Sequence, residues 1–189
     1  MRLFIAIEIP DGIKQGMAKA QEQLKRSGAS AGWTRPEGIH LTLQFLGEVP
    51  EAKVEGIREA LRQAAEGKAG FRLEIGGAGA FPDARRPRVV WMGVGGDLDR
   101  LQALQAAVEE AMSGIGFARE ERKFTPHLTL GRIRDIQSRD SWQKALDGIR
   151  DLRLGEFAVT GVSLMKSELR PSGAVYTEVA RVELVRRKT

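Results

Sequence analysis

His40-Leu41-Thr42-Leu43 is repeated letter for letter as His127-Leu128-Thr129-Leu130, and these two tetrapeptides contain both histidines of the 189-residue chain. At average residue usage a given histidine is followed by Leu-Thr-Leu roughly once in 2,000 cases. Two unrelated core histidines are therefore not expected to share this context. The repeat predicts that His40 and His127 act together in one site.

Each copy alternates polar and apolar residues, which is typical of a β-strand with one buried face. In such a strand the His and Thr side chains lie on one surface and the two Leu side chains point into a core. Two such strands placed side by side would form a cleft that offers a general acid, a general base and two hydrogen-bond donors. The candidate catalytic residues are His40, Thr42, His127 and Thr129.

The pattern of elements around the motif is also repeated. A strand, a helix, the motif strand, a second helix and a further strand are expected twice along the chain. The first strand of the first set starts at Leu3, 37 residues before His40, and that of the second set at Val89, 38 residues before His127. The similar offsets predict an internal duplication.

The chain is therefore expected to form a single domain over 1–189, with repeat halves of approximately 1–80 and 88–189. The predicted fold class is α+β, with two pseudo-symmetric lobes that enclose a central cleft. Each lobe is expected to be an antiparallel-rich sheet with outer helices, because each half supplies both strands and helices with one apolar side.

Some local features are expected as well. Asp11 and Asp97 precede helical patterns and are expected to cap those helices. The segment through Trp33 is expected to be a loop that leads to the first motif. The glycine-rich segment 76–82 is expected to be a flexible connection, since it lacks the spacing and the Lys-Ser/Thr pair of a phosphate-binding loop.

The composition limits the class of protein. The net charge is +5 and the pI about 9.8, partly because of the terminal run Arg186-Arg187-Lys188, and such a surface favours anionic partners such as nucleic acid. The absence of cysteine excludes disulfides, thiol catalysis and thiolate metal sites. No apolar run approaches the roughly 18 residues that span a bilayer. The apolar start, Met1–Pro10, is typical of a strand rather than a signal peptide, so a cytoplasmic monomer is expected.

The flanks of both motifs resemble a known family. Trp33, the run Arg35–Gly47 and the run Phe124–Arg132 are similar to the bacterial and archaeal RNA 2′,3′-cyclic phosphodiesterases, also called 2′-5′ RNA ligases, of the two-histidine phosphoesterase superfamily. The resemblance spans nearly the whole chain. It implies an RNA-processing hydrolase that opens 2′,3′-cyclic phosphodiester ends to 2′-phosphomonoesters without metal or cofactor, and it leaves open a reversible 2′-5′ RNA ligase activity.

The side chains suit this chemistry. Two histidines with an ordinary pKa near 6.5 allow one neutral and one charged ring near neutral pH, and Thr hydroxyls can donate to phosphoryl oxygens where charge develops. The resemblance implies that His40 is the proton donor and His127 the proton acceptor. The two copies are identical, so the residues alone leave these roles open.

A cation would add to charge stabilisation, and the family carries a basic residue shortly after its second motif. Arg132 is the candidate for binding the substrate. Simple alternation argues against it, because Arg132 lies two residues after Leu130 and four after Leu128. In a regular strand its side chain would therefore point to the buried face, as theirs do. It reaches the cleft only if the strand ends or bulges at Gly131. Phe45 has the same parity after the first motif and is expected in the core.

Three alternative functions remain open. A metal site is disfavoured, because Thr42 and Thr129, and not Asp or Glu, lie two residues after the histidines. A non-catalytic RNA-binding module would not need both histidines. The sequence does not exclude a related two-histidine enzyme that acts on small cyclic nucleotides or on ADP-ribose cyclic phosphate, but the basic surface favours an RNA end.

Overall fold

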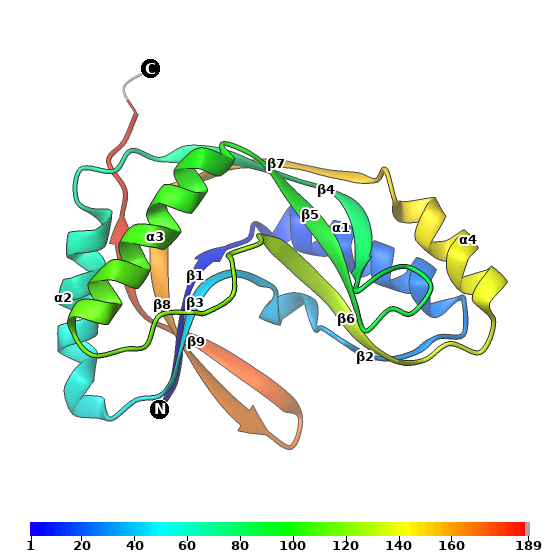
Figure 1. The fold of residues 1–189 in the computed structure, drawn as a ribbon, viewed down its shortest axis with the longest axis horizontal. Coiled ribbons are helices and arrows are strands. Elements are labelled where there is room, and N and C mark those ends of the chain that lie inside the picture. Colours follow the sequence, from blue (N-terminus) through cyan, green and yellow to red (C-terminus); the bar gives the residue numbers. More distant parts are fainter. Residues whose placement is uncertain (188–189) are drawn as a thin grey trace.

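The computed structural model describes residues 1–187, so Lys188 of the basic terminal run lies outside it. Within these residues there are four α-helices and nine β-strands (Figure 1). The helices are α1 (Asp11–Lys25), α2 (Val54–Ala65), α3 (Leu98–Gly114) and α4 (Arg139–Ile149). The strands are β1 (Arg2–Glu8), β2 (Ser30–Trp33), β3 (His40–Glu48), β4 (Phe71–Phe81), β5 (Val89–Gly96), β6 (His127–Asp135), β7 (Arg153–Val159), β8 (Gly161–Arg170) and β9 (Gly173–Glu183). Short 3-10 turns, η1 (Pro36–Gly38) and η2 (Glu51–Lys53), precede β3 and α2.

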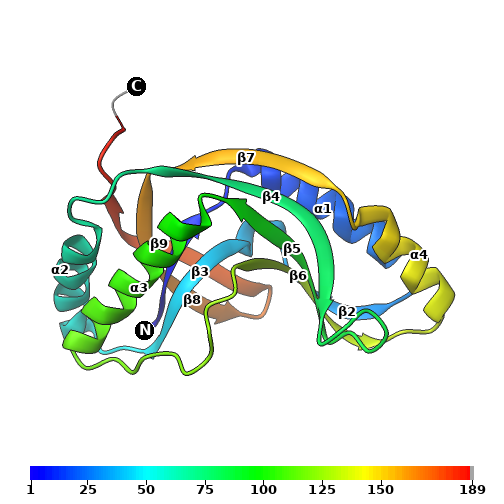
Figure 2. The same cartoon turned by 45° about the horizontal axis from the view of Figure 1, so that its top comes forward.

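The strands form two antiparallel sheets, with the orders β3-β1-β8-β9 and β2-β6-β5-β4-β7. Each sheet contains one motif strand, β3 in the first and β6 in the second. These two strands contact each other near the middle of the molecule, between the two lobes (Figure 2). The predicted α+β class, with two lobes around a cleft, is confirmed.

The two halves of the sequence exchange elements. β4, from the first half, pairs with β5, whereas β8, from the second half, pairs with β1. The helices exchange too: α1 follows β1 but contacts β6 and β7, and α3 follows β5 but contacts β3. Each motif strand is therefore supported by the first helix of the other half. The duplication itself stays a prediction.

The four motif leucines lie in the core, as the alternation predicts. Leu41, Leu43, Leu128 and Leu130 are each no more than 4% exposed and belong to one continuous apolar cluster. Full burial of such a side chain contributes about 1.5–3 kcal/mol. The core therefore fixes which face of each motif strand is left for His and Thr.

The glycine-rich segment is not a flexible connection, and that prediction was wrong. Residues 76–81 continue β4; Gly76 pairs with β7, and residues 78–81 pair with β5. A Cβ atom on Gly79 would lie 2.4 Å from the ring of Trp91 on β5, so the missing side chain makes room for the indole. The glycines thus permit close packing between strands.

Three smaller predictions also differ from the structure. The segment through Trp33 contains β2, which pairs with β6. In the described residues Asp11 makes no side-chain cap bond, because Pro10 occupies the cap position of α1. Asp97 occupies the N-cap position of α3, as expected, but its side chain makes no cap bond; its carboxylate instead accepts from the backbone N–H of Arg72 at 3.0 Å. Among the described residues, no helix has the length and apolarity needed to cross a membrane.

Candidate active site

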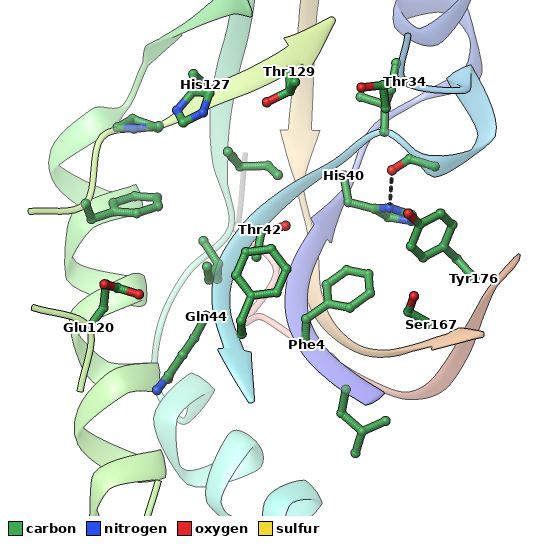
Figure 3. A pocket seen from close by; sticks show the side chains of 18 of the residues that line it. Phe4, Thr34, His40, Thr42, Gln44, Glu120, His127, Thr129, Ser167 and Tyr176 are labelled. Carbon is green, nitrogen blue, oxygen red and sulfur yellow. Dashed lines mark hydrogen bonds between the residues drawn. The ribbon is translucent and has the colours of Figure 1, made fainter. Parts of the chain in front are cut away.

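A cleft of about 970 Å³ lies where β3 and β6 meet. His40 and Thr42 line it from β3, and His127 and Thr129 line it from β6 (Figure 3). All four side chains are half-buried, so they are held by the fold yet open to a ligand. The structure therefore brings all four candidate residues to one cleft, although the first pair lies 87 positions before the second in the sequence.

Both histidines are held in the same way. His40 Nδ1 lies 3.0 Å from the carbonyl oxygen of Gly38, and His127 Nδ1 lies 2.7 Å from that of Thr125. A carbonyl only accepts, so Nδ1 carries a proton in each ring. Each Nε2 is then the nitrogen that can exchange a proton with a ligand: it accepts a hydrogen bond in the neutral ring and donates one in the charged ring.

Aromatic side chains set the orientation of both imidazoles. The His40 ring packs edge-on against Tyr176 and Phe4, with centroid distances of 5.3 and 5.7 Å. The His127 ring packs edge-on against Phe81 at 5.2 Å. These rings come from β9, β1 and β4, far from the motifs in sequence, and none was among the predicted site residues. The alternation of each motif gives no signal for them.

Burial lowers the pKa of His40 from its ordinary value of 6.5. The hydrogen bond to Gly38 opposes this change because it favours the charged ring, while the charge of Lys14 adds to the lowering. The unliganded protein therefore favours neutral His40. A bound phosphate diester would shift the balance towards the charged ring, since an anion stabilises imidazolium.

A β-bulge in β6 brings Arg132 to the cleft. In the pairing with β5, Val90 is opposite Gly131 and Trp91 is opposite Thr129, so Leu130 has no opposite residue. Leu130 and Gly131 are both buried, and the next residue returns to the face of Thr129. Arg132 is exposed and lines the cleft. The bulge on which its placement depends is present.

An equivalent bulge in β3 turns Phe45 to the same cleft. Ile5 is opposite Gln44 and Ala6 is opposite Thr42, so Leu43 is skipped. Phe45 is 69% exposed and lines the cleft, and its predicted place in the core was wrong. The cleft thus has a cation on one wall and an aromatic ring at the corresponding position of the other.

The charges around the cleft favour an anion. Four cationic side chains and one carboxylate are among the described residues that line it: Arg2, Arg122, Lys123, Arg132 and Glu120. Clefts lined by one sign of charge raise the local concentration of ligands of opposite sign. Within residues 1–187 no group of three or more His, Asp or Glu side chains is arranged to hold a metal ion.

The fold and the cleft together define a class: two-lobed α+β proteins in which each lobe contributes one His and one Thr to an anion-attracting site. The model of the 2′-5′ RNA ligase superfamily matches residues 10–171. The chain belongs to this superfamily, which confirms the resemblance seen in the motifs and their flanks.

Relatives match over almost their whole length. The chain is 35% identical over 179 residues to an RNA 2′,3′-cyclic phosphodiesterase of Methanothermobacter thermautotrophicus, covering 95% of this chain and 96% of the relative. It is 38% identical over 176 residues to a protein of the same name from Thermotoga maritima, covering 93% and 91%.

Solved structures share the fold. TT0787 of Thermus thermophilus is 30% identical and matches with a TM-score of 0.76, covering 97% of this chain and 98% of that one. Escherichia coli LigT complexed with 3′-AMP is 25% identical and matches with a TM-score of 0.78, covering 97% of both. The match includes both lobes.

Proposed function

We propose that this chain is a cyclic phosphodiesterase that opens the 2′,3′-cyclic phosphate end of RNA and leaves a 2′-phosphomonoester. One observation carries the proposal: two imidazoles, each with its Nε2 available, share a cleft with two threonine hydroxyls. The relatives named RNA 2′,3′-cyclic phosphodiesterase support the same substrate class.

The reaction needs one proton acceptor and one donor. The neutral Nε2 of His127 takes a proton from water, whose oxygen attacks phosphorus. The bond from phosphorus to the 3′ oxygen breaks, and the charged His40 gives its Nε2 proton to that oxygen. The product has a 2′-phosphate and a 3′-hydroxyl. The acid and the base each contribute a rate factor of roughly 10²–10⁴.

Other groups stabilise the phosphoryl oxygens. Thr42 and Thr129 donate their hydroxyls to the two non-bridging oxygens, where negative charge develops. Arg132 adds a cation from the bulge side of β6. Because burial lowers the pKa of His40, its role as donor depends on the bound phosphate, which restores the charged ring.

RNA is the favoured substrate because the chain is basic and cationic side chains line the cleft. If a ribose 5′-hydroxyl replaces water as the nucleophile, the same step forms a 2′-5′ bond, so the proposal includes reversible 2′-5′ RNA ligation. We assign the activity to a monomer, since one chain supplies every group of the site described above.

The decisive assay compares a short RNA ending in a 2′,3′-cyclic phosphate with the corresponding cyclic mononucleotides, all in excess chelator. We expect metal-independent hydrolysis of the RNA end, with 2′-phosphate as the product. Failure to hydrolyse any of these substrates contradicts the proposal. Loss of activity in chelator supports a metallohydrolase, and binding without turnover supports an RNA-binding module. A preference for mononucleotides supports the enzyme of small cyclic nucleotides.

A further inference from the structure

Two buried glutamine side chains reach the two bulges. Gln21 on α1 is 3% exposed, and its Nε2 donates to the carbonyl oxygens of Leu130 at 2.9 Å and Thr34 at 2.6 Å. Gln105 on α3 is 8% exposed, and its Nε2 lies 3.4 Å from the carbonyl oxygen of Leu43. Leu130 and Leu43 are the residues that the strand ladders skip.

The contacts of Gln21 are the shorter of the two sets, and they join three elements. The Leu130 carbonyl also accepts from the backbone N–H of Thr34 at 3.0 Å, where the chain leaves β2. One amide group of α1 therefore ties the end of β2 to the bulge of β6. The side-chain amide of Gln21 thus donates to the carbonyls of both Thr34 and Leu130. In a regular strand ladder no single donor would contact both of these carbonyls.

The bulge is also held from its other side. The Trp33 side chain covers Gly131, where an added Cβ would lie 2.8 Å from Cε3 of the indole and 3.3 Å from the Gly32 carbonyl oxygen. Gln21 fixes the carbonyl that precedes Gly131, and Trp33 fills the space above it. Arg132, the next residue, is then turned to the cleft.

Loss of the bulge would have a definite result. The side chains of a strand alternate with period two, so removal of one extra residue moves every later side chain to the opposite face. Arg132 would then take the parity of Leu128 and point away from the substrate. A leucine in place of Gln21 would fit the apolar core around α1 but would hold neither carbonyl.

We infer that Gln21 is a positioning residue, which fixes the β6 bulge and thereby presents Arg132 to the phosphoryl group of the substrate. The inference rests on the proposed function. Gln105 has the corresponding place on α3, but the bulge that it contacts presents Phe45 rather than a cation. It therefore serves as a matched control.

The test is a double-mutant cycle with Gln21→Met, which keeps the length of the side chain and removes its donors. Rates are measured with the cyclic RNA end well below the melting temperature of each variant. We expect kcat to fall about tenfold with KM within about twofold, a part of the roughly 10²–10³ that loss of a charge-stabilising group costs. The double variant with Arg132→Ala should be no slower than Arg132→Ala alone.

Gln105→Met is combined with Arg132→Ala in the same way. Here the two effects on kcat should multiply, because the β3 bulge does not present Arg132. If Gln21→Met does not fold, Trp33→Phe tests the same bulge from its other side, and its effect should also vanish in the Arg132→Ala background.

The outcomes separate the two proposals. Multiplying effects of Gln21→Met and Arg132→Ala, with a lowered melting temperature, would mean a structural role only and overturn the inference. An active wild type in which Arg132→Ala has no effect also overturns it, while the paired-histidine reaction stands. A wild type without hydrolysis overturns both.

Discussion

At the scale of single residues, the two imidazoles make equivalent hydrogen bonds through Nδ1. Removing either imidazole is therefore the first test of the proposed acid–base mechanism. His40→Ala and His127→Ala should each lower kcat by roughly 10²–10⁴, the usual size of a lost acid or base. The fold should survive, because both side chains are half-buried at the cleft. Single-turnover rates and circular dichroism melting measure the two effects separately. Loss of folding in both variants, with normal specific activity of the folded fraction, would instead indicate core histidines.

The lowered pKa of His40 predicts how stability changes with pH. The unfolded chain takes up a proton on His40 near pH 6.5, whereas the folded protein takes it up only at lower pH. The unfolded state therefore binds more protons in this window, and the free energy of unfolding falls as the pH falls below about 6.5, until the folded pKa is passed. His40→Gln removes this group. Urea unfolding at pH 7.5 and 5.5 should show a smaller loss of stability in the variant than in the wild type, and parallel losses would contradict the burial effect.

The rate should be bell-shaped in pH, since one ring must be neutral and the other charged. The two limbs belong to the coupled pair. Removing either histidine should abolish one limb of the remaining rate. Thr42→Val and Thr129→Val should cost about 10–10³ in kcat and leave both limbs in place, because they remove donors and not titrating groups. A bell that persists in both histidine variants would assign the protons to other groups.

At the scale of elements, the β6 bulge depends on Gly131. Gly131→Ala places a Cβ atom 2.8 Å from the Trp33 ring, and such overpacking typically costs about 1–3 kcal/mol. It should also lower kcat towards the level of Arg132→Ala. Gly56→Ala on α2 is the control, because a Cβ there meets nothing within 4 Å, and it should stabilise the helix slightly. Chemical unfolding and steady-state rates distinguish the two. Equal behaviour of both variants would contradict the packing argument.

The strand pattern explains how far the sequence could predict this site. Alternation gives the strands, the buried leucines and the common face of His and Thr, because these depend only on local periodicity. It misplaces Phe45 and leaves Arg132 conditional on a bulge, because the bulges are fixed by contacts with α1 and α3. Those contacts join residues 109 and 62 positions apart, and no local pattern indicates them. The same holds for the ring of Tyr176 against His40.

At the scale of the whole molecule, the exchange of strands predicts that neither half folds alone. A chain cut in the exposed loop between β4 and β5 would leave β4 without β5 and β7, and β1 without β8. The fragments 1–84 and 85–189 should each lack cooperative unfolding, since their apolar faces remain open. Mixed or co-expressed, they should associate and regain activity. Calorimetry and size-exclusion chromatography measure this, and a half that folds by itself would indicate two independent domains.

The pairing of β1 with β8 also has a consequence for synthesis of the chain. Arg2 is opposite Ser167, so β1 gains its second neighbour only after β8 has left the ribosome. At about 5–20 residues per second, this takes roughly 8–30 s. During that time β1 has an open edge, which is prone to pair with other chains. A ribosome that stalls on broken message before β8 would release a polypeptide whose first sheet lacks both β8 and β9. Only a chain translated through β8 therefore gives β1 both of its neighbours.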